Sequence, residues 1–211
     1  MKNRYLVQRR RLSVNEQALS VREAIVTRRS IKNFNGQPIE PEIIPEIIED
    51  AVWAPNHGNR NPWRLIVATG EQYEELLDVL KEFGVANWKQ LSDEDLEKQM
   101  KKFSTASAAV FVIVPEDVRQ KERLEDYAAA SILIQNIQLL AWDKGVGTCW
   151  KTPPFIDNPK FRERLGIEAG ERIISMLQFG YFDTSPKAPP RKPVEEIITY
   201  FGSSEDEEEE A

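Results

Sequence analysis

Two neighbouring segments in the middle of the chain are too apolar to lie on a protein surface. Residues 108–114 (AAVFVIV) form a continuous apolar run closed by Pro115, which predicts a strand buried on both faces of a sheet. Residues 124–143 predict the longest helix, which is apolar nearly all round from Ala128 onward. Such a helix is buried, either in a core or against a partner. The fold must therefore cover both faces of a sheet and most of a long helix.

The rest of the chain mixes helices and strands without regular alternation. Apolar spacing and breaker residues predict helices over 14–27, 41–53, 71–83, 93–103 and 159–165, and strands over 63–69, 148–151 and 173–181. A proline-rich connector over 186–193 precedes a last strand or arm over 194–201. This order favours an α+β layered domain over a doubly wound sheet. Because the chain lacks G-x-G-x-x-G and Walker A sequences, dinucleotide or ATP binding by those motifs is unsupported.

Composition indicates one soluble globular domain. The chain has 211 residues, of which 41% are hydrophobic and 30% are charged. We expect a basic arm over 1–13, a single domain over 14–202 and a disordered acidic tail over 203–211, which carries six of the seven net negative charges. No segment predicts a membrane span and no signal peptide is visible, so the expected location is the cytoplasm, without a membrane partner.

Single copies of two residue types restrict the chemistry. Cys149 is the only cysteine and His57 the only histidine, which excludes an intramolecular disulfide and leaves no basis for a metal site. The basic arm could contact nucleic acid, but we favour a solvated or partner-wrapping extension and expect no nucleic-acid partner.

Arg28-Arg29-Ser30 lies at the predicted end of the first helix. Basic residues there complement the helix dipole, which would make the triplet purely structural. Alternatively, two guanidinium groups and a hydroxyl form a clamp for a phosphate or similar anion. The basic Arg191-Lys192 pair, in the proline-rich connector, would strengthen the second interpretation if it folded back beside Arg28.

Two further segments carry unusual polar chemistry. Residues 56–61 crowd Asn56, His57, Asn59 and Asn61 into six positions, which suits a ligand with a polar edge, although a loop can also satisfy such groups internally. Residues 145–154 combine two glycines with Lys151. Glycines allow close approach of the backbone to a ligand, but they also fit a helix end that leads into a strand.

These segments follow one another as they do in the nitroreductase family, which the chain resembles over roughly residues 20–201. The resemblance rests on Arg28-x-Ser30, on Ala54-Pro55-Asn56-His57 with Pro62-Trp63, and on Trp150-Lys151-Thr152. The family usually has Gln before the Pro-Trp pair, whereas this chain has the shorter Asn61. The resemblance implies a mostly antiparallel mixed sheet flanked by helices in an intertwined homodimer, with residues 124–143 central to the interface.

The resemblance also implies two FMN molecules between the subunits. Arg28, Arg29 and Ser30 would hold the phosphate, ribityl chain and pyrimidine edge, and Arg191 would add a charge at the phosphate. His57 and Asn61 would reach the flavin from the partner subunit. Trp150, Lys151 and Thr152 would line the isoalloxazine, while residues 82–103 would form a lid.

The implied activity is hydride transfer from NADH or NADPH to the flavin, and then to a nitroaromatic, a quinone or a similar small acceptor. Because the flavin performs the redox chemistry, no catalytic side chain is expected. Two alternatives remain open. One is a flavin enzyme with another reaction, such as reductive dehalogenation or O₂-dependent oxidation. The other is a non-enzymatic binding or regulatory protein.

Overall fold

An antiparallel sheet forms the centre of the molecule. The computed structural model describes residues 18–202, in which β1 (Arg64–Thr69), β2 (Ala108–Pro115), β3 (Gly147–Lys151) and β4 (Glu171–Gly180) form one sheet in the order β1-β2-β4-β3. Each neighbouring pair is antiparallel. A single parallel bridge, between Ser30 and Thr148, adds the segment after the first helix to the β3 edge. The predicted α+β class with a mostly antiparallel sheet is confirmed.

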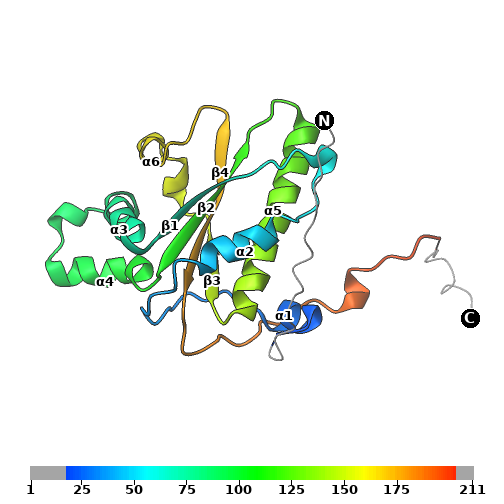
Figure 1. The fold of residues 1–211 in the computed structure, drawn as a ribbon, viewed down its shortest axis with the longest axis horizontal. Helices are drawn as coiled ribbons and strands as arrows, with labels where there is room; N and C mark the ends of the chain where they lie inside the picture. The colour runs from blue at the N-terminus through cyan, green and yellow to red at the C-terminus, as the bar shows by residue number, and fades with distance from the viewer. Residues whose placement is uncertain (1–17, 203–211) are drawn as a thin grey trace, which may run out of the picture.

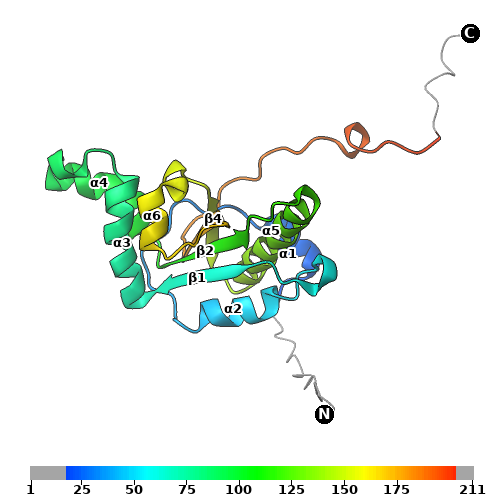
Figure 2. The same ribbon diagram turned by 90° about the horizontal axis from the view of Figure 1, so that it is seen from above.

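Helices cover both faces of this sheet (Figures 1 and 2). They are α1 (Val21–Thr27), α2 (Ile43–Ala51), α3 (Gly70–Gly84), α4 (Asp93–Ser104), α5 (Gln120–Asp143) and α6 (Pro159–Arg164). Short 3-10 turns lie at His57–Asn59, Trp88–Gln90, Pro154–Asp157 and Val194–Glu196. Side chains from α3, α4 and α6 pack on one face, and side chains from α2 and α5 pack on the other.

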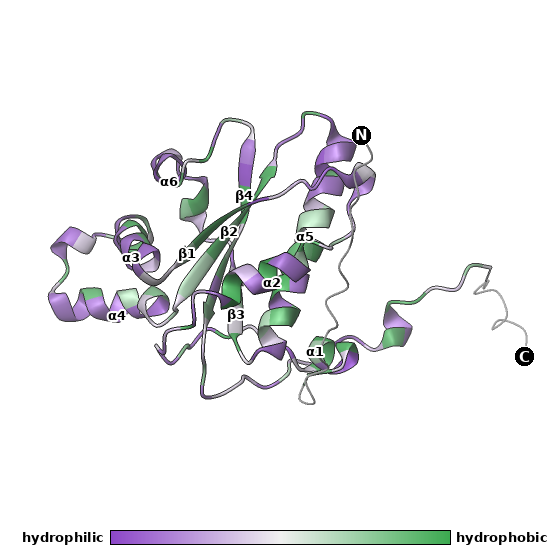
Figure 3. Cartoon of the chain, in the orientation of Figure 1, coloured by the Kyte–Doolittle hydropathy of each residue, from purple (hydrophilic) through white to green (hydrophobic). Residues whose placement is uncertain are grey.

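Strand β2 separates the two halves of the core, as its sequence predicts. Phe111 and Ile113 belong to the cluster beneath α3 and α6, whereas Val110 and Val112 belong to the cluster beneath α2 and α5. All these side chains are at most 1% exposed. Successive residues of a strand point to opposite faces, so a strand covered on both sides must be apolar throughout. Figure 3 shows this central apolar strand beside the strongly polar α4.

Helix α5 is the longest helix in the described part of the chain. Its Leu133, Ile134 and Ile137 are fully buried against the sheet. Its outer side is more open, because Ile132 is 39% exposed. The helix begins at Gln120, four residues before the predicted start, since its first turn is charged and carries no apolar signal.

Several element boundaries differ from prediction. Helix α1 begins at Val21 because Ser20 forms a capping box with Glu23; residues 14–17 of the predicted helix lie outside the described range. Residues 194–201 form no strand and contain only the Val194–Glu196 turn, within an exposed arm that leaves the body of the molecule (Figure 1). The basic arm predicted over 1–13 and the acidic tail predicted over 203–211 also fall outside the described residues. Among helices of residues 18–202, none is long and apolar enough to cross a membrane.

Candidate functional site

The Arg28 side chain is half-buried, and two of its guanidinium nitrogens lack a hydrogen-bond partner among the described residues. Arg28 caps the C-terminal end of α1 with its backbone, which donates to the Ala24 carbonyl at 3.0 Å. Its Nε and Nη1 atoms are buried and have no hydrogen-bond partner within residues 18–202. Burial lowers the pKa of Arg28, and the charges of Arg29 and Arg191 lower it further. A buried charge that lacks a partner is costly, so this position favours an anionic ligand.

The other members of the basic cluster have defined positions. Arg191 lies near enough to Arg28 to repel it electrostatically, so the proline-rich connector does bring the two together. Arg29 partly caps the helix, because its Nη1 donates to the carbonyls of Val26 at 2.9 Å and of Arg28 at 2.8 Å. Arg29 thus fits the structural interpretation of the triplet, whereas Nε and Nη1 of Arg28 are left without a partner among the described residues.

Beyond Arg28, the chain runs along the edge of the sheet. The Ile31 N–H donates to the Thr148 carbonyl at 2.9 Å, next to the Ser30 bridge. Ile31 points into the core at 1% exposure, and alternation therefore places Ser30 and Lys32 together on the other side. Both residues line a cavity of about 380 Å³ whose opposite wall includes Thr184 and Ser185.

A larger cavity of about 650 Å³ shares Lys32 with the first and is called the lysine cavity below. Its described lining contains Lys32, Lys101, Lys102 and Lys151 and no carboxylate. Burial lowers the pKa of Lys151, and the charges of Lys102 and Lys32 lower it further. The predicted residues Trp150 and Thr152 flank Lys151 at the end of β3, where both are exposed. The lysine cavity thus extends the positive region that begins at Arg28.

A third cavity, the aromatic cavity, adjoins the lysine cavity and has a volume of about 560 Å³. Lys102 and Lys151 line both. Residues 82–88 and 102–103, which fall within the predicted lid, line the aromatic cavity together with residues 153–155. Sequence reasoning found Lys151 but missed Lys32, Lys101 and Lys102. The available signal for Lys32 was its position two residues after Ser30.

The asparagine loop (residues 56–61) is largely satisfied by its own hydrogen bonds. The Asn61 N–H donates to Asn56 Oδ1 at 2.9 Å, Asn56 Nδ2 donates to Asn61 Oδ1 at 3.3 Å, and Asn61 Nδ2 donates to the Asn59 carbonyl at 3.2 Å. Asn59 and Asn61 adopt left-handed backbone conformations, with φ of 51° and 48°, which asparagine tolerates better than most residues. These bonds occupy the Asn61 amide, whereas His57 is exposed.

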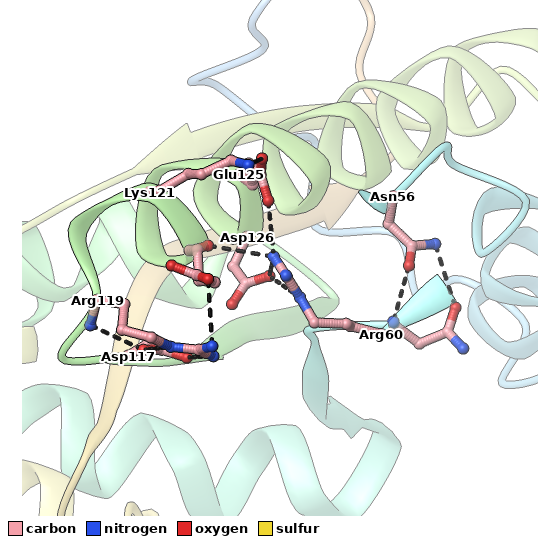
Figure 4. A network of polar contacts seen from close by, with 9 residues as sticks. Asn56, Arg60, Asp117, Arg119, Lys121, Glu125 and Asp126 are labelled. Carbon is pink, nitrogen blue, oxygen red and sulfur yellow. Dashed lines mark hydrogen bonds and ion pairs between the residues drawn. The ribbon is translucent and has the colours of Figure 1, made fainter. Parts of the chain in front are cut away.

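Arg60 fastens the asparagine loop to α5 (Figure 4). Its Nη2 lies 2.7 Å from Asp126 Oδ1 and 3.3 Å from Glu125 Oε2, and its Nε also donates to Asp126. The Asp126 carboxylate is 3% exposed, so this ion pair is largely removed from water on one side. Sequence reasoning missed Arg60 because its partner is distant in the chain.

The loop and the arginine triplet lie at opposite ends of α5. Trp142, near the C-terminal end of the helix, donates from Nε1 to Thr27 Oγ1 at 3.0 Å, whereas the asparagine loop is held at Asp126. The sixteen helical residues between Asp126 and Trp142 span about 24 Å. The structure therefore brings Arg28, Ser30, Lys151 and Arg191 to one region and keeps His57 and Asn61 of the same chain away from it.

Fold and site together define a small α+β protein with a cationic, cavity-lined region along one edge of an antiparallel sheet. The sequence matches the nitroreductase family over residues 25–181. It is 32% identical, over 180 residues, to the Bacillus subtilis (strain 168) protein YfhC, whose name describes an NAD(P)H nitroreductase; the match covers 85% of this chain and 93% of YfhC. The chain belongs to the nitroreductase family, as the sequence motifs predict.

Solved structures of similar proteins share the fold. A nitroreductase-like family protein from Bacillus cereus is 35% identical, with a TM-score of 0.76 over 88% of this chain and 97% of that chain. NfnB, described as an FMN and NADPH-dependent nitroreductase from Sphigopyxis sp. strain HMH, is 20% identical, with a TM-score of 0.70 over 88% of this chain and 100% of that chain. The second likeness is evidence for the fold alone.

Proposed function

We propose that this protein is an FMN-dependent oxidoreductase that takes hydride from NADH or NADPH and passes electrons to a small acceptor such as a nitroaromatic or a quinone. The observation that carries the proposal is the half-buried Arg28, whose buried Nε and Nη1 have no partner among the described residues and which the charges of Arg29 and Arg191 repel. A phosphate monoester offers the negative charge and the acceptor oxygens that this group lacks. Membership of the family and the name of YfhC support the same chemistry.

The described residues fit FMN in both charge and order. The arginine cluster suits the phosphate, the cavity beside Ser30 suits the ribityl chain, and the lysine cavity suits an electron-rich ring system. When bound, FMN supplies the two-electron hydride chemistry, so no acid–base side chain is required. The residues that would hold it are Arg28, Arg29, Ser30, Lys32, Trp150, Lys151, Thr152 and Arg191, with His57 and Asn61 from a second copy.

The role of the chain's own residues is electrostatic. The ammonium groups of Lys32 and Lys151 create a positive potential before any ligand arrives. Charges that are fixed in advance in a partly buried site need little reorganisation as negative charge develops. Burial and the charges of neighbouring lysines disfavour the charged form of Lys151, so an electron-rich ligand beside it would stabilise that charged form.

We also propose that the complete site needs a homodimer. His57 and Asn61 lie away from Arg28 of their own chain, because their loop is held at Asp126 whereas the end of α1 is held at Trp142, about 24 Å further along α5. A two-fold dimer would bring the asparagine loop of one copy to the arginines of the other. Ile25 and Val26 of α1 and Trp53 after α2 are 54%, 51% and 79% exposed, which leaves apolar surface for a partner.

The test is whether the purified protein carries or takes up FMN. We expect a yellow protein whose flavin absorbance bleaches when NADH or NADPH is added without oxygen and returns when a nitroaromatic or quinone is supplied. A colourless protein that does not quench the fluorescence of added FMN would contradict the proposal. A flavin-containing protein that neither nicotinamide reduces would contradict the choice of electron donor.

A further inference from the structure

The aromatic cavity has flat apolar walls. Phe103 and Phe155 meet edge to face, with ring centroids 6.4 Å apart, and Phe155 contacts Phe161 in the same manner at 4.9 Å. Trp88 and the Pro153-Pro154 pair contribute further flat surface. At about 560 Å³, the cavity is large enough for a one- or two-ring molecule. Planar aromatic ligands pack best on surfaces of this kind.

Two ammonium groups lie over one of these walls. Lys102 Nζ is 5.0 Å and Lys151 Nζ is 5.8 Å from the centre of the Phe103 ring. Lys102 Nζ donates to the Gly84 carbonyl at 2.9 Å, and Lys151 Nζ donates to the Lys102 carbonyl at 3.3 Å. Neither lysine forms an ion pair with a carboxylate of residues 18–202. An ammonium has three donor hydrogens, so each lysine keeps donors for a ligand.

The remaining charge on the cavity lining does not cancel these lysines. Glu82 is its only carboxylate within the described residues, and Glu82 faces Arg164, with Oε2 3.7 Å from Nη2. Lys89 Nζ also lies 5.4 Å from the Trp88 ring, whereas Lys81 Nζ, 5.3 Å from the same ring, is paired with Asp78 at 2.7 Å. The cavity therefore combines apolar walls with a net positive rim.

The end of α4 that carries Lys102 and Phe103 is anchored from below. The buried Tyr73 hydroxyl donates to the Phe103 carbonyl at 2.8 Å, and the buried Gln178 Nε2 donates to the Lys102 carbonyl at 3.4 Å. Gly84 lies directly under the Phe103 ring, because a Cβ atom built there would stand 2.7 Å from it. The core thus fixes the Phe103 ring and the backbone from which the Lys102 side chain extends.

We propose that the aromatic cavity is the acceptor site of the proposed reductase, and that the acceptor is a planar aromatic molecule with an acidic group, such as a nitrobenzoate, held by Lys102 and Lys151. This inference rests on the proposed function and narrows it. The ring packs on Phe103 and Phe155, and the carboxylate pairs with the two ammonium groups. For a nitro acid, one hydride equivalent from NAD(P)H and one solvent proton break one N–O bond and release the nitroso product and water.

Paired acceptors test the charge requirement. In the holoenzyme, kcat/KM for 4-nitrobenzoate is expected to exceed that for its neutral methyl ester by about ten-fold or more, as a charge-assisted hydrogen bond provides. Lys102→Met should abolish most of that ratio, while Lys121→Met, on the exposed first turn of α5, should preserve it. The proposal would be overturned if Lys102→Met left the ratio of the two kcat/KM values unchanged, including the case in which both values fell by the same factor. Gly84→Ala, which displaces Phe103, should lower kcat/KM for both acceptors by the same factor.

Binding without turnover gives an independent measurement. 2-Naphthoate should quench the fluorescence of Trp88 at a lower concentration than 2-naphthamide, and Trp88→Phe should remove the signal. Equal affinities for the two would overturn the inference, even if the protein contains FMN and is reduced by NAD(P)H. A protein that takes up no FMN would overturn the proposed function, and with it the acceptor role of this cavity.

Discussion

Arg60 and Asp126 join the asparagine loop to α5 through a 2.7 Å ion pair, although 66 positions separate them in the chain. The carboxylate is buried while the guanidinium keeps some contact with solvent. Glu125 and the Glu122 carbonyl add weaker bonds to the same guanidinium. The loop that carries His57 is therefore attached to α5 through Arg60, and its other bonds are internal or go to the flanking residues Ala54 and Trp63.

Removal of Arg60 should harm the protein more than neutralisation of Asp126. Arg60→Met leaves the buried Asp126 carboxylate without its partner, and an unsatisfied buried group costs about 1–3 kcal/mol. Asp126→Asn keeps an acceptor oxygen and should cost less. Urea unfolding of both variants, with Lys121→Met as a surface control, measures the difference. Equal stability of Arg60→Met and the wild type would show that the loop is held by other contacts.

Arg28→Ala should weaken FMN binding by about 1.5–3 kcal/mol, the range for a hydrogen bond to a charged group. The substitution removes a half-buried guanidinium whose Nε and Nη1 lack a partner within the described residues. Arg22→Ala is the matched control, because Arg22 is exposed on the same short helix. Titration of apoprotein with FMN, followed by flavin fluorescence, gives both affinities. Identical dissociation constants for the two variants would remove Arg28 from the phosphate site.

Two truncations separate the C-terminal arm from the acidic tail. A chain that ends at Gly202 should keep its flavin and its dimer, because the acidic run is predicted to be solvated. A chain that ends at Pro193 lacks Val194, Ile197 and Phe201, which are 55%, 67% and 108% exposed and thus available to a partner. In sedimentation experiments, its dimer should dissociate at a higher protein concentration than the dimer of the full chain does. Flavin loss already at the Gly202 truncation would reveal an unexpected role for the tail.

The contribution of Asp117 to stability should depend on pH. Arg119 donates to Asp117 from its side chain and its backbone, and these bonds lower the pKa of Asp117 to about 2 from the ordinary 3.8. A lowered carboxylate pKa means that the folded state favours the ionised form. Its contribution is therefore present above pH 3.8 and is lost as the pH falls through about 2. The melting temperatures of Asp117→Asn and the wild type should differ near neutral pH and converge in acid; a constant gap would contradict this assignment.

Much of the fold was predictable because burial leaves a local imprint. An apolar run such as residues 108–114 has no stable location except between two layers, and the structure places it there. Element ends were less predictable. The first turn of α5 is polar, and residues 194–201 have strand-like apolar composition but no neighbouring strand within the described residues.

The candidate site was predictable only where a motif marked it. Arg28 and Lys151 stand in recognisable segments, whereas Lys101 and Lys102 look like the solvated face of a charged helix. Their position beside Lys32 depends on how α4 meets the edge of the sheet, which no local pattern encodes. The same holds for Arg60, since a buried carboxylate such as Asp126 is indistinguishable in sequence from an exposed one.

The length of α5 leads to a complementation test between two variants that each weaken the proposed pocket. If Arg28 and His57 of one pocket come from different subunits, Arg28→Ala protein and protein with both His57→Ala and Asn61→Ala each have every pocket damaged. After random exchange of subunits, half of the dimers are hybrids with one intact pocket, so about a quarter of all pockets regain function. Pockets built from a single polypeptide would show no such rescue.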